Sequence, residues 1–236
     1  NDITLLEDCC ESHGATFKSE KIGNFGKASS FSFYYGHHMT TIEGGMVCTD
    51  DDEVYEKLLL IRSHGLLREL PKYMQKKYRD RKVDENFTFV VPGYNVRSTD
   101  LNAVLGQMQL KDLDNHNNIR RNNFDVFASG LNKDKFYTDF KVEGNSSFCF
   151  PVITKSTRED TLALRKYLES QGVETRPIIA GNLYEHPFMD RVNQYRHDKN
   201  AKVVHQNGFY VGNNHAVNVG DVTWLVERLN AWERGE

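Results

Sequence analysis

The chain has 236 residues, of which 39% are hydrophobic and 27% are charged, a composition typical of a soluble globular protein. Its formal net charge is -3, so the chain lacks the surplus of basic residues that indicates nucleic acid as the main partner. Single side chains and backbone amides could still bind a phosphorylated small molecule. No apolar run reaches the roughly 18 residues of a spanning helix, so we expect no membrane partner. No Cys-x-x-Cys pair occurs, and we expect reduced thiols in a cytoplasmic protein; the cysteines are Cys9, Cys10, Cys48 and Cys149.

Three strands are predicted in the first part of the chain. Residues 3–6 form an apolar run that ends in acids and is typical of a buried strand. The chain starts at Asn1 without Met or a leader, and because a domain rarely begins inside its core, we expect that an upstream part of the large domain is missing. Residues 28–34 alternate small, polar and aromatic side chains, and residues 45–49 give the third strand.

A helix is predicted to start near Asp50, with Glu53 completing a capping box, and to end at Gly65. Its spacing predicts one apolar stripe made of Val54, Leu58 and Ile61. Residues 72–82 are dense in Lys, Arg and Tyr. This basic segment favours a solvated loop or helix face, and the alternative is a lid near an anionic substrate.

Residues 92–95 indicate a turn, after which a long helix is predicted with Ser98 or Thr99 as its cap. After a break, we expect a helical continuation to Gly130. The apolar face of the helix consists of Leu101, Val104, Leu105, Met108 and Leu113.

The last part of the chain predicts a small α+β domain. Residues 148–153 and 173–178 have strand patterns, and the helix between them spans residues 157–171, with Thr157 and Asp160 as a capping box. A terminal amphipathic helix is predicted at residues 221–232. This order indicates a β-α-β unit with further helices. We therefore divide the chain into residues 1–130, the end of a large domain with a linking helix, and residues 131–236.

Three short motifs lie close together near the start of the chain. They are EDCCESHGA at residues 7–15, SFSFYYGHH at residues 30–38 and TTIEGG at residues 40–45. In this order and spacing they resemble the DegT/DnrJ/StrS family of sugar aminotransferases. The resemblance extends to GYNVRSTDL at residues 93–101, TRP at residues 175–177 and VGN at residues 211–213, and it therefore covers essentially the whole chain.

The resemblance implies an α/β fold of the aspartate aminotransferase type, called fold type I, with a mostly parallel sheet and a small α+β C-terminal domain. It implies pyridoxal phosphate or pyridoxamine phosphate as cofactor, no metal, and a homodimer with a shared active site. Asp8 at a strand's carboxyl end would hold the pyridinium nitrogen protonated. Glu11, where many members have Gln, would lie near the ring, and Ser32 would bind the phosphate. Asn95 would reach the phosphate across the dimer interface, and Arg176 would bind substrate.

Each of these residues also has an ordinary structural interpretation. Asp8 could be a helix cap or a turn acid, Ser32 a plain strand serine and Asn95 a turn residue. The three motifs together favour the cofactor roles over these alternatives.

The decisive departure from the family is at position 37. The family's lysine stands five residues after the serine and six before the Glu of EGG, which is the position of His37. Imidazole has no primary amine and cannot form the covalent link to pyridoxal phosphate that lysine forms. His37 resembles a subset of the family, the 3-dehydratases that make 3,6-dideoxysugars. Its neighbour His38 is the alternative acid-base group.

Histidine suits this reaction because imidazole can take up one proton and deliver another near neutral pH. Some 3-dehydratases hold an iron-sulfur cluster on cysteines, but the four cysteines here form no clustered set. The chain resembles the cluster-free kind, which acts on GDP-4-keto-6-deoxymannose in the colitose pathway and regenerates pyridoxamine phosphate with L-glutamate. Three alternatives stay open: another nucleotide sugar as substrate, an ordinary sugar aminotransferase, and a non-catalytic protein that keeps the fold.

Overall fold

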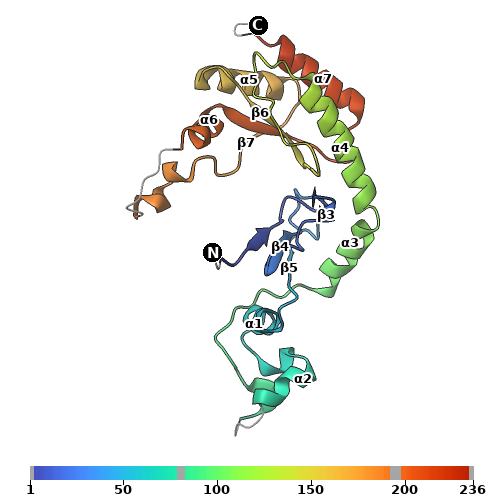
Figure 1. Ribbon diagram of the computed structural model, residues 1–236, viewed down its shortest axis with the longest axis vertical. Helices are drawn as coiled ribbons and strands as arrows, with labels where there is room; N and C mark the ends of the chain where they lie inside the picture. Colours follow the sequence, from blue (N-terminus) through green and yellow to red (C-terminus); the bar gives the residue numbers. More distant parts are fainter. Residues whose placement is uncertain (1–2, 79–82, 192–197, 234–236) are drawn as a thin grey trace. The chain divides into compact units, whose positions relative to one another are not determined.

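A computed structural model describes residues 3–78, 83–191 and 198–233, and its chain forms two compact units, Asn1–Asp114 and Asn115–Glu236 (Figure 1). This division differs from the boundary expected after residue 130. The long helix α4 (Leu113–Gly130) goes with the second unit because Phe124 and Phe127 pack in that unit's core. None of the helices in the described residues is long and apolar enough to span a membrane.

The first unit contains a three-stranded sheet in the order β1-β4-β5. Its strands are β1 (Leu6–Asp8), β4 (Ala28–Ser32) and β5 (Gly45–Cys48). β1 runs parallel to β4, with Asp8 opposite Ser30, whereas β5 runs antiparallel to β4. These described strands therefore form a mixed sheet and do not by themselves give the mostly parallel sheet that we expected. A small hairpin of β2 (Thr16–Phe17) and β3 (Glu20–Lys21) follows β1.

The prediction that residues 3–6 are a buried strand is wrong for the described residues. The strand starts only at Leu6, and the Leu6 side chain is 68% exposed. Ile3 and Leu5 are exposed as well, because no described element packs over their side chains.

The cap of helix α1 (Asp52–Arg62) lies one residue later than predicted. It is Asp51, whose carboxylate accepts a hydrogen bond from the backbone N of Val54, so the capping box of Asp50 and Glu53 is wrong. The predicted apolar stripe is also wrong, because the buried face carries Glu56 and Leu60. Leu60 packs in a small core with Leu67, Leu70 and Met74.

The basic segment at residues 72–82 begins with two short helices, α2 (Lys72–Gln75) and η2 (Lys76–Tyr78). Lys77 and Tyr78 both donate to the buried carboxylate of Glu56 on α1, so this part of the segment closes the small core. Residues 79–82 lie outside the described residues. Two further 3-10 turns flank the segment, η1 (Leu67–Glu69) and η3 (Glu85–Phe87).

Helix α3 (Asp100–Leu110) begins where the sequence predicts. Thr99 is the cap, and it forms a capping box with Asn102. The predicted apolar face of α3 is exposed in the described residues, where Leu101 is 80% exposed. The buried position on α3 is instead Gly106, where an added Cβ would lie 3.2 Å from Cγ2 of Thr41.

The second unit has a three-stranded antiparallel sheet in the order β6-β8-β7. Its elements after α4 are β6 (Cys149–Ile153), α5 (Arg158–Ser170), β7 (Thr175–Pro177), η4 (Leu183–Glu185), η5 (Pro187–Arg191), α6 (Lys199–Asn207), β8 (Gly208–Gly212) and α7 (Val219–Ala231). The predicted β-α-β order is present as β6-α5-β7. However, β8 lies between the two strands, and neither β8 nor α6 was predicted from the sequence.

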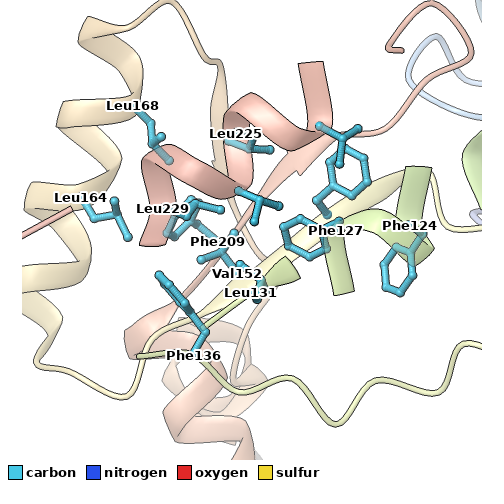
Figure 2. Packing of buried hydrophobic residues seen from close by; sticks show 13 residues of the cluster. Phe124, Phe127, Leu131, Phe136, Val152, Leu164, Leu168, Phe209, Leu225 and Leu229 are labelled. Carbon is cyan, nitrogen blue, oxygen red and sulfur yellow. The ribbon is translucent and has the colours of Figure 1, made fainter. Parts of the chain in front are cut away.

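One apolar core holds the second unit together (Figure 2). Helices α4, α5 and α7 cover the face of the sheet from which Val152 and Phe209 project. Phe127, Leu168 and Leu229 reach this core from the three helices and are fully buried. Burying each such side chain stabilises the fold by roughly 1.5–3 kcal/mol, so this core fixes the sheet on which Arg176 lies.

Candidate active site

Asp8 is the last residue of β1, and its carboxylate is held by the turn that follows. Oδ1 accepts a hydrogen bond from the backbone N of Cys10 at 3.2 Å and lies 3.4 Å from the hydroxyl of Ser30. Hydrogen bonds from the thiol and backbone N of Cys10, with a smaller contribution from Ser30, lower the pKa of Asp8. The side chain is therefore an anion at neutral pH.

Ser32 is the last residue of the neighbouring strand β4. On this strand, Ser30 is the residue that lies opposite Asp8. Residues two apart on a strand point to the same face, so Ser32 and Ser30 share a face of the sheet. The Ser32 hydroxyl accepts a hydrogen bond from the backbone N of Tyr34 at 3.2 Å. Two of the predicted cofactor-binding residues thus lie at the carboxyl end of one pair of parallel strands.

His37 and Glu11 come together from the loops that follow β4 and β1. The imidazole Nε2 of His37 lies 3.5 Å from Oε1 of Glu11, and the His37 side chain is 11% exposed. The backbone N of His37 donates to the carbonyl of Tyr34, and the Tyr34 ring lies edge-on to the imidazole at 5.7 Å between centroids. Backbone and side-chain contacts therefore both orient the imidazole.

His38 has a different environment from His37. It is buried, and its ring lies 5.4 Å from the ring of His13, which in turn packs 5.5 Å from the ring of Phe31. The contact with Glu11 belongs to His37. No role was expected for His13 from the sequence; its ring also lies 5.9 Å from the ring of Phe33.

The loop after His37 is anchored to α3 by side chains that the sequence analysis missed. The amide of Gln109 accepts from the backbone N of Thr40 at 3.0 Å and donates to its carbonyl at 2.6 Å. Asn102 donates to the carbonyl of Thr41 at 2.7 Å. The only sequence signal for these contacts was that Asn and Gln interrupt an otherwise apolar helix.

The Glu-Gly-Gly motif closes the same loop. Ile42 has a φ of 74°, and an added Cβ at Gly44 would lie 2.3 Å from Oγ1 of Thr41. The hydroxyl of Thr41 donates to the carbonyl of Glu43 at 2.8 Å. Gly44 is needed because no side chain fits at this close approach.

Glu7 is a second acid that the sequence analysis left without a role. Its carboxylate accepts hydrogen bonds of 2.7 Å each from the backbone N–H groups of Gly23, Phe25 and Gly26. Burial acts to raise the pKa of Glu7, and the three backbone donors outweigh it and lower the pKa. Glu7 therefore ties the loop at residues 23–26 to β1, which supports Asp8.

Asn95 and Arg176 stand on elements other than β1, β4 and the loops that follow them. Asn95 is exposed, its Oδ1 accepts from Nε of Arg97 at 3.1 Å, and its backbone forms a bridge with Ser63. Arg176 lies on β7 in the second unit, where its Nε donates to Glu174 at 2.9 Å. The roles of both residues stay predictions. The described residues contain no group of three or more His, Cys, Asp or Glu side chains that could hold a metal ion.

Comparison with known proteins is consistent with this arrangement. The model of the DegT/DnrJ/EryC1/StrS aminotransferase family matches residues 1–230. The chain belongs to this family. Within the DegT/DnrJ/EryC1/StrS family it is 40% identical to GDP-4-keto-6-deoxy-D-mannose 3-dehydratase of Escherichia coli O55:H7, over 97% of this chain and 61% of that protein.

Solved structures give the same family fold. A mutant GDP-4-keto-6-deoxymannose-3-dehydratase with bound GDP-perosamine matches with a TM-score of 0.86 and 37% identity, over 97% of this chain and 61% of the other. A structure of GDP-4-keto-6-deoxymannose-3-dehydratase with a trapped PLP-glutamate geminal diamine matches with a TM-score of 0.85, 37% identity and the same coverage. The chain has the aminotransferase fold and spans about 61% of the length of these relatives.

Proposed function

We propose that this protein is a 3-dehydratase that depends on pyridoxal phosphate and pyridoxamine phosphate. Its proposed substrate is GDP-4-keto-6-deoxy-D-mannose, from which it removes the C3 hydroxyl in the synthesis of a 3,6-dideoxysugar. The observation that carries this proposal is His37, which stands at the family's lysine position and lies 3.5 Å from Glu11. The 40% identity to the E. coli 3-dehydratase supports the choice of reaction.

The donor set at the ends of β1 and β4 fits the cofactor. The carboxylate of Asp8, whose pKa is lowered, suits a protonated pyridinium nitrogen, and the hydroxyl of Ser32 suits a phosphate. When bound, the cofactor supplies an electron sink conjugated to the sugar. Asp8 would maintain that sink by keeping the ring nitrogen protonated.

His37 would perform the proton transfers. Its imidazole would remove a proton from the cofactor carbon that carries the amine and deliver a proton to the C3 hydroxyl, which leaves as water. The Glu11 carboxylate would orient the imidazole and balance its positive charge between the two transfers. A lysine at position 37 would instead compete for the cofactor through its amine, and the histidine removes that competing reaction.

The remaining partners rest on the resemblance and on the solved relatives. L-glutamate would restore the amine form of the cofactor, and Arg176 would bind the anionic part of the nucleotide sugar. Asn95 would bind the cofactor phosphate in the neighbouring subunit of a homodimer in the cytoplasm.

Subunits with His37→Asn and subunits with Asn95→Ala should together regain activity, because one site of each mixed dimer is intact. Verified mixed dimers without activity would contradict the shared site.

The test of the proposed function is to incubate the protein with pyridoxal phosphate, glutamate and a set of 4-keto nucleotide sugars, followed by mass spectrometry of the products. Loss of the C3 oxygen from the GDP sugar is the expected result. Loss from a UDP or dTDP sugar instead would change the substrate but keep the reaction. An amino sugar product would indicate an aminotransferase, and no product from any sugar would favour a non-catalytic protein.

A further inference from the structure

A cavity of about 270 Å³ lies in the second unit, between α5, the loop that follows β7 and the end of α6. Its wall contains Arg158, Arg165, His186 and His205. Among the described residues no Asp or Glu lines it. We propose that this cavity binds a small phosphorylated metabolite. The proposed 3-dehydratase reaction assigns no ligand to this cavity.

Helix α5 supplies the two guanidinium groups from one face. Arg158, Leu162 and Arg165 follow the spacing that places side chains on the same side of a helix. Within the part of the chain that the structure describes, Arg158 has neither a hydrogen bond nor an ion pair from its side chain. All of its N–H donors are therefore available to a ligand.

Arg165 is held in place by the neighbouring strand. Its Nε donates to the hydroxyl of Thr175 at 3.1 Å, and that hydroxyl donates to Glu169 at 2.7 Å. Thr175 is buried, so it fixes the direction of the Arg165 side chain. The terminal N–H groups of Arg165 remain as donors, and two guanidinium groups can share one phosphate through paired hydrogen bonds.

The opposite wall is a strained loop held by the two histidines. Ala180 has a φ of 61° and Gly181 a φ of 53°, and such left-handed residues often occur at ligand sites. Nδ1 of His205 accepts from the backbone N of Asn182 at 3.3 Å, so the neutral His205 ring carries its proton on Nε2 as a donor. Nε2 of His186 donates to the carbonyl of Ala180 at 2.7 Å and fixes the loop.

The cavity is separate from the residue proposed to bind the nucleotide sugar. Pro177 lines it, and Pro177 shares a face of β7 with Thr175. Arg176 lies between them and points to the opposite face, because side chains alternate along a strand. The apolar side chains of Leu162 and Ile178 also line the cavity, and they would contact an organic group attached to the phosphate.

The test is isothermal titration of the full chain with two probes, inorganic phosphate and glycerol 3-phosphate. All titrations use a Ser32→Ala background, because the proposed cofactor-phosphate site could otherwise bind the probes. The double variant Arg158→Gln with Arg165→Gln removes both guanidinium groups, and Arg158→Gln alone changes an exposed side chain. Lys166→Gln, an exposed neighbour on α5 that does not line the cavity, is the matched control.

We expect both probes to bind, and the ester to bind more tightly because of the apolar wall. The double variant should bind about tenfold more weakly or worse, because the phosphate loses both of its guanidinium partners. Arg158→Gln alone should lose part of the affinity, and Lys166→Gln should match the background. Tighter binding of inorganic phosphate than of the ester would keep the site and identify the free ion as its ligand. Absence of binding, or equal affinity in the double variant, would overturn the proposal whether or not the 3-dehydratase activity is found.

Discussion

Nε2 of His37 and Oε1 of Glu11 lie 3.5 Å apart, although one residue follows β4 and the other follows β1. The parallel pairing of these two strands brings the loops together. A carboxylate beside an imidazole is the arrangement that orients a histidine and balances its charge in acid-base catalysis. The relationship predicts that Glu11 acts on the reaction through His37.

Replacing Glu11 with Gln should lower the turnover number of dehydration by about tenfold or more, because general acid-base catalysis depends on the orientation of the imidazole. KM should change little, since Glu11 is proposed to act on His37 and not on the sugar. Steady-state kinetics measures both constants. Glu20→Gln, an exposed acid in β3, should leave both unchanged. An unchanged turnover number for Glu11→Gln would remove Glu11 from the mechanism.

Replacing Glu7 with Gln should lower the free energy of unfolding at pH 7 by about 1 kcal/mol, because the carboxylate accepts three backbone hydrogen bonds at a partly exposed place. The folded-state pKa of Glu7 is lowered. Its contribution is therefore complete above the pKa of the unfolded state and is lost as the pH falls through the lower pKa of the folded state. Denaturant unfolding should show the difference at pH 7 and a smaller one in acid. A difference that grows in acid would contradict this assignment.

The loop after His37 depends on Gln109, which makes two hydrogen bonds with the backbone of Thr40. Gln109→Ala should reduce the free energy of unfolding by about 1–2 kcal/mol, because two partly buried backbone groups lose their partner. Gln107 is an exposed residue on the same helix, and Gln107→Ala should change the stability by less than about 0.5 kcal/mol. Equal effects of the two changes in chemical denaturation would show that the loop does not need this anchor.

Borohydride reduction of the protein with pyridoxal phosphate should leave no pyridoxyl group on the peptide that contains His37, because imidazole lacks a primary amine. Peptide mapping by mass spectrometry detects the label. The His37→Lys variant is the positive control and should be labelled at that position. A stable label on the unsubstituted peptide would refute the assignment of position 37.

The sequence allowed the local positions of several candidate site residues to be predicted, whereas their roles stay predictions. Asp8, Ser32 and His37 lie in short motifs whose spacing is fixed by strand ends and tight turns. The anchors Asn102 and Gln109 were missed because a polar residue on a helix gives no sign of its distant partner. Glu7 was missed because its three partners are backbone groups, which leave no pattern in the sequence.

The fold was predicted less well where pairing is non-local. Strand β8 was missed, and with it the antiparallel order β6-β8-β7, because β8 enters between two strands that precede it in the chain. The apolar side chains of β1 and α3 were predicted to be buried, but they are exposed in the structure. The prediction was wrong because hydrophobic periodicity does not show which element covers a face.

The most direct test of the central claim is a comparison of His37→Asn with His38→Asn for loss of the C3 oxygen from GDP-4-keto-6-deoxymannose, measured by mass spectrometry of the product. His37 contacts Glu11, whereas His38 is buried beside His13. The His37→Asn protein should bind the cofactor but lose deoxygenation, and the His38→Asn protein should keep most of it. A His37→Asn protein that still removes the C3 hydroxyl, together with an inactive His38→Asn protein, would contradict the account.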